Sequence, residues 1–433
     1  MLGMFGVETD VWDQLGAYQT GGAAAESAKH RIYGSGKPDD TTPERANAIV
    51  NGAEDDPTPN VGVDHPNIVA IMNESWADFE DFGNLTLTES PMNYINSVSN
   101  AIHGHAYTSV FGAGTSTSEF EFLTGNSMNF LPSGSIPYQQ YILGPTDSLA
   151  TLLKGYGYET RAFHPGERTS WQRNIAYPRL GFDSFKCGED MDVPQTEEHG
   201  YVSDQSDFEQ IIWELEHKEE GKPLFLFNVT IQNHGGYTVP DYPAQITVAT
   251  RRGSTPWRSS TSPWRARPTR PSAPWWSISG PLTSPPSWLC SGITSLGGAG
   301  LSGFGLRRHP GADDYGAVYG QILCALCHLG QLSPARDGAG ETSLNFLGQY
   351  LLRYAGIAGT PYGDFLWQLQ EELPALIFVG YTDAAGRAYS HLETNDFTAR
   401  IEDYQRLQYN NLFGGQDRLA AFFDPESGGA TGG

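Results

Sequence analysis

Two runs of consecutive apolar residues constrain the fold of this chain more than any other feature. NIVAIM at residues 67–72 and PLFLFNV at residues 223–229 lack the alternation of a strand that faces water on one side. Such continuous runs are typical of parallel strands that are buried on both faces. A third strand is expected at YETRAFH, residues 158–164. Periodic segments at 147–155 and 206–218 predict helices between them, and this alternation indicates an α/β fold with a mostly parallel central sheet sandwiched by helices.

The remaining sequence divides into stretches of different character. Residues 1–63 are rich in Gly, Ala and Asp and predict a loose N-terminal arm with one short helix near 42–51. A catalytic domain is expected over residues 64–413, and its pattern is interrupted at 249–335, where Arg, Pro and Trp are scattered without any period. Helical periodicity then returns, and residues 414–433 are interpreted as a disordered tail.

The charge of the chain excludes one class of function. Its 433 residues carry a formal net charge of −24, which argues against nucleic-acid binding because few cations are present to neutralise phosphates. An acidic enzyme can still act on an anionic substrate when a bound metal ion supplies positive charge.

The sequence carries no membrane or export signal, and it contains one pattern associated with haem. The chain has no run of about 18 apolar residues, so no transmembrane helix is expected. The first residues, MLGMFGVETDVW, lack a basic region followed by an apolar core, so no signal peptide is expected either. Cys324-Ala-Leu-Cys327-His328 matches the attachment pattern of c-type haem. Nothing else in the sequence supports this cofactor, and we expect no haem.

The segment IMNESWADF places Glu74 directly after the first apolar run. Ligands of parallel α/β sheets bind beyond the carboxyl ends of the strands, so a carboxylate here is well placed for a site. Position alone allows an exposed loop glutamate equally well.

The segment FGAGTSTSEFEFLTG, residues 111–125, combines small residues with a hydroxyl group. Gly112 and Gly114 permit close backbone approach, and Thr115 lies just before a helix expected to open at about Ser118. A hydroxyl at a helix N-terminus is suited to attack phosphorus, because free N–H groups and the helix dipole favour an anion there. Taken alone, an ordinary Ser/Thr-rich turn is the simpler interpretation.

Together and in this order, NIVAIMNESW and GTSTSEFEFLTG resemble the lipoteichoic acid synthase family of the alkaline phosphatase/sulfatase superfamily. The resemblance extends over about residues 64–248 and 341–413. It implies that Glu74 is a metal ligand and that Thr115 is both a metal ligand and the catalytic nucleophile. The implied metal is Mn²⁺, or another divalent ion such as Mg²⁺ or Zn²⁺.

The segment RAFHPGERTSWQRN resembles the part of the family that grips the substrate phosphate. The resemblance makes His164, Trp171 and Arg173 substrate-binding residues, and His and Arg side chains can both donate to phosphate oxygens. Taken singly, Trp171 is equally a core aromatic residue, and a histidine is more often structural. The family usually has an acidic residue two positions after the histidine; this chain has Gly166 there, with Glu167 as the nearest replacement.

The segment FNVTIQNHGGY places His234 at the family's strand-end histidine, which contacts the transferred group or acts as an acid or base. Thr115-Ser-Thr-Ser is not the CxPxR motif that sulfatases need for formylglycine. A threonine nucleophile favours phosphoryl transfer through a phospho-threonine intermediate. The resemblance thus implies a metal-dependent phosphoglycerol transferase that moves glycerol phosphate from a phosphatidylglycerol-type lipid to a cell-envelope polymer or glycolipid.

Two alternatives to this activity stay open. One is a hydrolase of the same superfamily, acting on phosphodiesters or sulfate esters, and the other is a catalytically dead product with an incomplete metal site. By the resemblance, the catalytic domain works at the membrane surface on the extracellular face of a bacterial cell, after transmembrane helices. This chain lacks such helices, so we expect its N-terminus to be truncated or to start internally.

The incomplete metal site is the main departure from the family. The family supplies an Asp-His pair, usually within GDHQ, and this chain contains no GDH. The expected position falls in PSWLCSGITSLGG, residues 286–298. If each codon is read from its third base, residues 286–295 can encode VVAVLGDHQP, a strand followed by the motif. We therefore predict a frameshift over about 249–335. Several small insertions or deletions are expected rather than one, because LCHLGQ at 326–331 needs a different shift to encode the strand-like CAIWAN.

Overall fold

The computed structural model describes the chain in separate stretches. The described residues are 37–53, 65–75, 87–90, 93, 101–110, 114–132, 134–198, 200–235, 246, 286–293, 323–329, 341–378, 380–391 and 393–419. Only the backbone is described for residues 101–103, 286–293 and 323–329.

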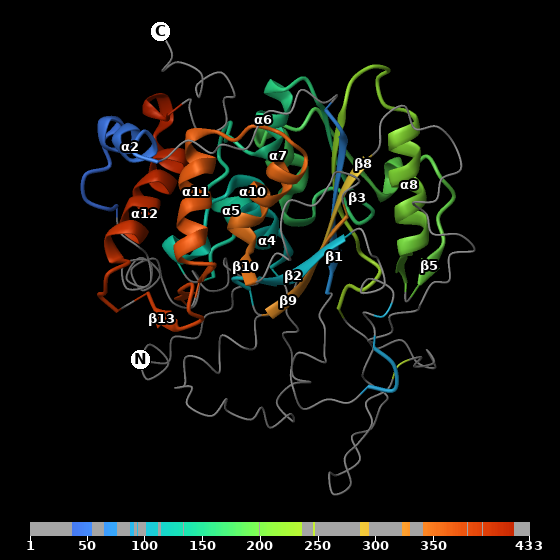
Figure 1. The fold of residues 1–433 in the computed structure, drawn as a ribbon. Helices are drawn as coiled ribbons and strands as arrows, with labels where there is room; N and C mark the ends of the chain where they lie inside the picture. Colours follow the sequence, from blue (N-terminus) through green and yellow to red (C-terminus); the bar gives the residue numbers. More distant parts are fainter. Residues whose placement is uncertain are drawn as a thin grey trace, which may run out of the picture.

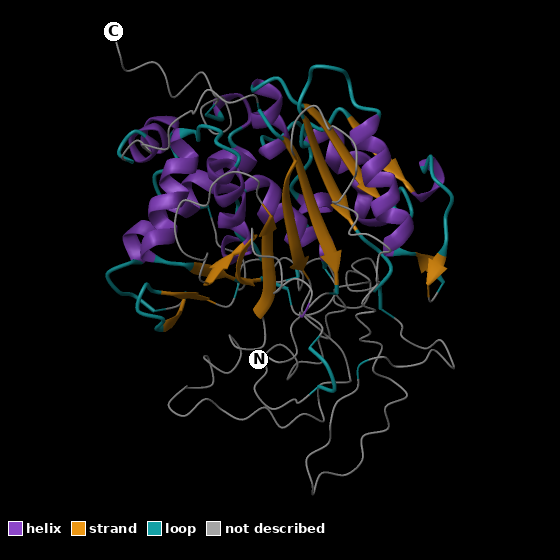
Figure 2. Ribbon diagram, turned by 45° about the vertical axis from the view of Figure 1, so that its right-hand side comes forward, coloured by secondary structure: helices purple, strands orange, loops and turns teal. Residues whose placement is uncertain are grey.

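An eight-stranded sheet runs through the middle of the molecule (Figures 1 and 2). Its strand order is β10-β2-β9-β8-β1-β7-β3-β4, and every neighbouring pair is parallel except the two that include β9. The expected mostly parallel central sheet is therefore confirmed. Its strands are β1 (Asn67–Glu74), β2 (Ala101–Tyr107), β3 (Glu159–His164), β4 (Ser184–Cys187), β7 (Leu224–Val229), β8 (Pro286–Ile293), β9 (Leu323–Leu329) and β10 (Glu341–Ser343).

Helices cover both faces of this sheet, as the expected sandwich requires (Figure 1). One face carries α8 (Asp204–Glu216), and the opposite face carries a larger group around α4 (Thr115–Thr124) and α10 (Leu344–Tyr354). The other α-helices of the described residues are α2 (Pro43–Val50), α5 (Pro137–Gln140), α6 (Leu149–Gly155), α7 (Arg173–Arg179), α11 (Pro361–Glu372) and α12 (Thr398–Phe413). Two small sheets add β5 (Glu197–Glu198) with β6 (Tyr201–Val202), and β11 (Ala375–Ile377) with β12 (Gly380–Thr382) and β13 (Ala388–Ser390).

Strand β1 is buried along its whole length because it supplies both faces of the core. Val69 and Ile71 join Ile211 of α8 in one apolar cluster, whereas Ala70 and Met72 join the larger cluster on the opposite face. This division follows the two-residue period of a strand. It explains why β1 and β7 read as continuous apolar runs rather than as alternating ones.

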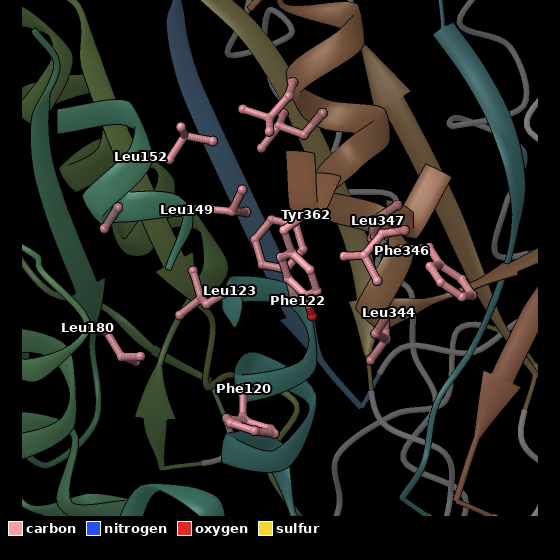
Figure 3. Close-up of a cluster of buried hydrophobic side chains, with 14 of the residues drawn as sticks. Phe120, Phe122, Leu123, Leu149, Leu152, Leu180, Leu344, Phe346, Leu347 and Tyr362 are labelled. Carbon is pink, nitrogen blue, oxygen red and sulfur yellow. The ribbon is translucent and has the colours of Figure 1, made fainter. Parts of the chain in front are cut away.

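The larger cluster packs helices against each other and against the sheet, and Figure 3 shows members from α4, α6, α10 and α11. Burying a leucine or phenylalanine side chain stabilises a fold by about 1.5–3 kcal/mol, so this cluster fixes the position of α4 on the sheet. Its labelled members are Phe120, Phe122 and Leu123 of α4, Leu149 and Leu152 of α6, Leu180 directly after α7, Leu344, Phe346 and Leu347 of α10, and Tyr362 of α11.

The pattern-breaking stretch contributes two strands to the sheet. Strand β8 pairs with β1 in parallel register over all eight residues, from Pro286 opposite Asn67 to Ile293 opposite Glu74. Strand β9, which contains the CxxCH run, pairs with β2 and β8 in antiparallel direction. The carboxyl end of β8 therefore lies at the same edge of the sheet as the carboxyl end of β1.

The structure adds detail at both ends of the described chain and one strand that the sequence did not predict. The short helix expected near 42–51 is present as α2, and its Ala46, Ile49 and Val50 belong to the main core. At the other end, Leu419 is also buried in that core. Strand β2 was not expected. No helix in the described stretches is both long and apolar enough to cross a membrane.

Candidate active site

Glu74 and Thr115 meet at the carboxyl edge of the sheet. Glu74 is the last residue of β1 and Thr115 is the first residue of α4, and both are buried. The Thr115 hydroxyl donates a hydrogen bond to Glu74 Oε1 over 3.4 Å. The Glu74 N–H donates to Thr230 Oγ1 at 3.0 Å, which ties the end of β1 to the segment after β7. The structure thus brings together the two residues that the sequence nominates as metal ligands.

Helix α4 begins three residues earlier than expected from the sequence. Gly114 is its N-cap residue and has a φ of 69°, a left-handed conformation that glycine adopts without strain. A Cβ at this position would lie 3.0 Å from Val110 Cγ1, so space also favours glycine. The expected start at Ser118 was wrong because the residues from Thr115 onward already have helical geometry. Thr115 is therefore part of the first turn, close to the positive end of the helix dipole.

Burial raises the pKa of Glu74 from 4.5 to about 7, although the charge of Arg173 and the Thr115 hydrogen bond act in the opposite direction. The nearby charge of Glu119 adds to the increase. A buried carboxylate with an elevated pKa lacks sufficient positive charge around it, and a bound cation would supply that charge. Glu74 and Thr115 therefore fit a divalent metal ion by their chemistry.

The donor set for such an ion is incomplete in the part of the chain that the structure describes. No group of three or more His, Cys, Asp or Glu side chains is arranged there to hold a metal. Oxygen and imidazole donors bind divalent metals most firmly when several converge, so Glu74 and Thr115 alone predict weak binding.

His164 is buried at the end of β3, and its Nδ1 lies 2.8 Å from the carbonyl oxygen of Val229. Burial and the charge of Arg173 hold the pKa of His164 well below its usual value, so the ring is neutral. Because a carbonyl can only accept, Nδ1 carries the proton and Nε2 presents a lone pair. The His164 ring therefore offers an acceptor, suited to a substrate hydroxyl, whereas the sequence argument expected a donor to phosphate.

The absence of a side chain at Gly166 leaves the space that the His164 ring occupies. A Cβ on Gly166 would lie 2.5 Å from His164 Nε2 and 2.7 Å from Ile231 Cδ1, closer than real Cβ atoms approach. An acidic residue at this position would displace the ring. Glu167 is exposed, and no hydrogen bond of its side chain to a site residue is found among the described contacts.

Arg173, the first residue of α7, is buried in an ion pair with Glu119 of α4. Its Nη2 and Nε donate to Glu119 Oε1 at 2.6 and 3.1 Å, and the Tyr177 hydroxyl donates to Glu119 Oε2 at 2.7 Å. The charge of Glu119 raises the pKa of Arg173, so the guanidinium stays charged despite its burial. Glu119 has no role in the sequence argument, because only tertiary packing brings it to Arg173.

His234 lies at the open side of the site, with about half of its side chain exposed. Its Nε2 is 3.8 Å from Glu74 Oε1, and its Nδ1 is 3.2 Å from the hydroxyl of Tyr201 on β6. Tyr201 also donates to the Gly235 carbonyl at 3.4 Å. Tyr201 carries no signal in the sequence, because it belongs to a short hairpin distant from every motif.

Left-handed backbone conformations flank the candidate residues. Ser75 follows the end of β1 with a φ of 58°, and Trp171 and Gln172 precede Arg173 with φ values of 57° and 59°. Among the described residues, Asp40 is the only other non-glycine residue with a positive φ. Such conformations cost on the order of 1–3 kcal/mol each and cluster at functional sites. Trp171 itself is partly buried, and its contact with a glycerol group stays a prediction.

The fold and the site define a class of protein: an α/β protein that brings a buried hydroxyl and a buried carboxylate together at the carboxyl edge of a mostly parallel sheet. Residues 66–273 match the family model named Sulfatase. Over these residues, a little under half of the chain, the sequence is similar to sulfatase domains, in line with the resemblance to the alkaline phosphatase/sulfatase superfamily.

Curated relatives match a limited part of the chain. It is 40% identical over 178 residues to a "Putative cyclic beta-1,2-glucan modification protein" of Rhizobium meliloti, covering 41% of this chain and 27% of the relative. It is 29% identical over 187 residues to a lipoteichoic acid synthase of Staphylococcus saprophyticus, covering 42% of this chain and 28% of the relative. The matches thus span little more than a quarter of the length of either relative.

Solved structures share the fold over most of the chain. The phosphoglycerol transferase GacH of Streptococcus pyogenes, in complex with sn-glycerol-1-phosphate, has a TM-score of 0.63 at 15% identity, over 90% of this chain and 100% of that one. An alkaline phosphatase superfamily protein of Vibrio parahaemolyticus has a TM-score of 0.54 at 14% identity, over 88% and 97% of the two chains. At these identities the likeness shows the fold alone.

Proposed function

We propose that this domain is a divalent-metal-dependent phosphoglycerol transferase that works through a phospho-threonine intermediate. The observation that carries the proposal is the Thr115 hydroxyl, held at the first turn of α4 and directed at the buried Glu74. The charge of Arg173 reaches the same carboxylate, and His234 lies beside it. The relatives named above, a lipoteichoic acid synthase and a phosphoglycerol transferase, support this choice of reaction.

In the proposed first step, Thr115 Oγ forms a bond to phosphorus and the bond from phosphorus to the diacylglycerol oxygen breaks. The Thr115 proton is lost to water, and His234 Nε2 gives a proton to the departing oxygen. In the second step an acceptor hydroxyl attacks phosphorus and gives its proton to His234. The bond to Thr115 Oγ breaks, and a proton from water restores the Thr115 hydroxyl group, while Glu74 stays ionised throughout.

The remaining candidates bind the transferred group. Arg173 donates to phosphate oxygens, and the Nε2 of neutral His164 accepts a hydrogen bond from a glycerol hydroxyl. Trp171 covers the glycerol carbons. A divalent ion held by Glu74 and Thr115, Mn²⁺ by family, would lower the pKa of the Thr115 hydroxyl and stabilise negative charge on the phosphoryl group.

The proposed donor is a phosphatidylglycerol-type lipid, and the acceptor is a glycerol phosphate polymer or a glycolipid of the cell envelope. Such a reaction requires the domain to work at a membrane surface, and we propose the extracellular face of a bacterial membrane. Both parts of this assignment rest on the relatives rather than on a contact within this chain.

The register of β8 supports the proposed frameshift. Ile293 lies opposite Glu74, and the sequence that follows is Thr-Ser-Leu-Gly-Gly, which has no carboxylate, imidazole or thiolate to offer a metal. In the alternative reading frame the Asp and His of GDHQ fall at about positions 292–294, beside the position paired with Glu74. Sequencing the DNA of codons 245–340 tests the proposal: a gene without a second open frame that encodes GDHQ would refute it.

Activity is tested with liposomes that contain fluorescent phosphatidylglycerol. The chain with Mn²⁺ should release diacylglycerol, Thr115→Ala should abolish the release, and Thr115→Ser should retain part of it, because serine keeps the nucleophilic oxygen. Mass spectrometry of the trapped enzyme should find glycerol phosphate on Thr115.

The same assay separates the alternatives. Free glycerol phosphate without acceptor product would favour the hydrolase. The catalytically dead alternative predicts no release and no stoichiometric Mn²⁺ binding, whereas tight Mn²⁺ binding by this polypeptide would exclude it.

A further inference from the structure

The ion pair between Arg173 and Glu119 is the one most completely shielded from water among those of the described residues, with side-chain exposures of 2% and 0%. Burying two charges costs several kcal/mol per ion before their attraction compensates, so apolar replacements are often as stable. A buried pair of this kind is therefore weak evidence for a role in stability alone. The pair lies one turn of α4 from Thr115, which is hydrogen-bonded to Glu74, and this location points to a use in the site.

The geometry of the pair leaves part of the Arg173 side chain for another ligand. A guanidinium has five N–H groups, arranged in one fork along Nε and Nη2 and a second fork along Nη1 and Nη2. Glu119 engages the first fork, with bonds from Nε and Nη2. Nη1 takes no part in this pairing. The second fork, formed by Nη1 and Nη2, matches the spacing of two phosphate oxygens.

Helix α4 connects this arginine to the proposed nucleophile. Thr115 and Glu119 are four residues apart on α4, so their side chains occupy neighbouring positions on one face of the helix. The same helix thus carries the hydroxyl that would attack phosphorus and the carboxylate that orients the guanidinium. Tyr177, which donates to the other Glu119 oxygen, limits rotation of that carboxylate.

We infer that Glu119 is a positioning residue, which holds the guanidinium of Arg173 at a fixed place relative to Thr115 so that it binds the phosphate group of the substrate. This inference rests on the proposed function. Glu119 also neutralises the charge of Arg173, which interacts electrostatically with Glu74 as well. Glu74 is therefore not needed as the ion-pair partner of Arg173. Both effects keep the site open for an anion and a cation at once.

The test measures binding of sn-glycerol 1-phosphate by calorimetry to the full chain and to Glu119→Gln. We expect Glu119→Gln to bind about tenfold more weakly, since an amide orients a guanidinium less firmly than a carboxylate does. Glu121→Gln is the matched control, because Glu121 is equally buried on α4 and its side chain is bonded to Ser109 and Met128 instead of Arg173. Its affinity should stay within about twofold of the wild-type value.

A double-mutant cycle separates positioning from a general effect on the fold. In an Arg173→Met background, Glu119→Gln should cause no further loss of affinity, because the residue acts through the guanidinium. A loss that persists in that background would overturn the inference, and so would unchanged affinity of Glu119→Gln. If Glu119→Gln does not fold, Tyr177→Phe replaces it, because it removes one hydrogen bond that orients the Glu119 carboxylate. Tyr177→Phe should weaken binding by about threefold, and this loss should also disappear in the Arg173→Met background. Absence of binding by the wild-type chain would instead refute the proposed function and the inference with it.

Discussion

Trp171 and Gln172 occupy two consecutive left-handed backbone positions directly before Arg173. The turn is held by hydrogen bonds from the Gln172 N–H to the Thr169 carbonyl at 2.8 Å and from the Ser170 N–H to the Glu167 carbonyl at 3.1 Å. These bonds offset part of the strain and aim the start of α7 at the sheet edge. The strain therefore contributes to the position of the Arg173 side chain.

Replacing Gln172 by glycine should relieve this strain. A left-handed conformation costs about 1–2 kcal/mol for an ordinary residue, and glycine loses about 0.4–1 kcal/mol through its more flexible unfolded state. We therefore expect Gln172→Gly to raise the free energy of unfolding by roughly 0.5–1 kcal/mol in urea denaturation. Asn174→Gly, at an exposed helical position two residues on, is the control and should lower stability by a few tenths of a kcal/mol. A loss of stability in Gln172→Gly would contradict the prediction.

Single residues also show where sequence reasoning ends. Glu74, Thr115 and His234 could be nominated because each follows a recognisable strand or opens a motif. Glu119 and Tyr201 could not, because their importance comes from contacts with residues 54 and 33 positions away. The acceptor role of His164 depends on the Val229 carbonyl, which only the folded sheet brings to the ring.

At the scale of elements, the site is assembled from strand ends and the loops that follow them. The loop after β3 passes so close to the His164 ring that Gly166 has no room for a side chain. The chain after β7 passes Gly235, where an added Cβ would meet nothing within 4 Å. These two glycines therefore form a matched pair for testing how tightly the site is packed.

We expect Gly166→Ala to lower the free energy of unfolding by about 1–3 kcal/mol, because the ring and Ile231 must move to admit the methyl group. Gly235→Ala should leave stability within about 0.5 kcal/mol of the wild-type value. Urea denaturation of both variants provides the comparison. Equal stability of the two variants would show that the His164 ring is not held in the described position.

Elements differed in how well the sequence predicted them. Strands β1, β3 and β7 and helix α8 were predicted because burial on both sheet faces or on one helix face leaves a clear apolar pattern. Strand β2, AIHGHAY, was not, because two histidines and a glycine disrupt that pattern. Its place is set by pairing with β9 and β10, which lie far along the chain.

At the scale of the whole molecule, buried carboxyl groups link stability to pH. Burial raises the pKa values of Glu74, Glu121 and Asp204 to about 7. A carboxyl group with a raised pKa in the folded state stabilises the fold fully below its unfolded pKa. That contribution is lost as pH rises through the folded pKa. These three groups should therefore lower the free energy of unfolding between about pH 4.5 and pH 7.

Glu121→Gln isolates one of these contributions. A shift from 4.5 to about 7 corresponds to roughly 3.5 kcal/mol at most, at about 1.4 kcal/mol per pKa unit, and most of it falls between pH 4.5 and pH 7.5. The free energy of unfolding of Glu121→Gln, relative to the wild type, should therefore rise by up to roughly 3 kcal/mol between pH 4.5 and pH 7.5. Parallel pH curves for the two proteins would contradict this prediction.

Ser109→Ala provides the complementary change. The Ser109 hydroxyl donates to Glu121 Oε1 at 2.7 Å and thereby lowers the pKa of Glu121. Its removal should raise that pKa further and extend the decline in stability to higher pH. The Glu121→Gln/Ser109→Ala double variant should show no such extension, because it lacks the titrating group.

The long sequence distance between β1 and its partners has a consequence during synthesis. Strands β7 and β8 begin roughly 150 and 210 residues after β1 ends. At about 5–20 residues per second, the ribosome needs roughly 10–40 seconds to deliver both partners. During that time an apolar strand with two unpaired edges is outside the ribosome, where it can pair with other nascent chains. We therefore expect the yield of folded protein in cell-free translation to depend strongly on added chaperones that bind unfolded segments.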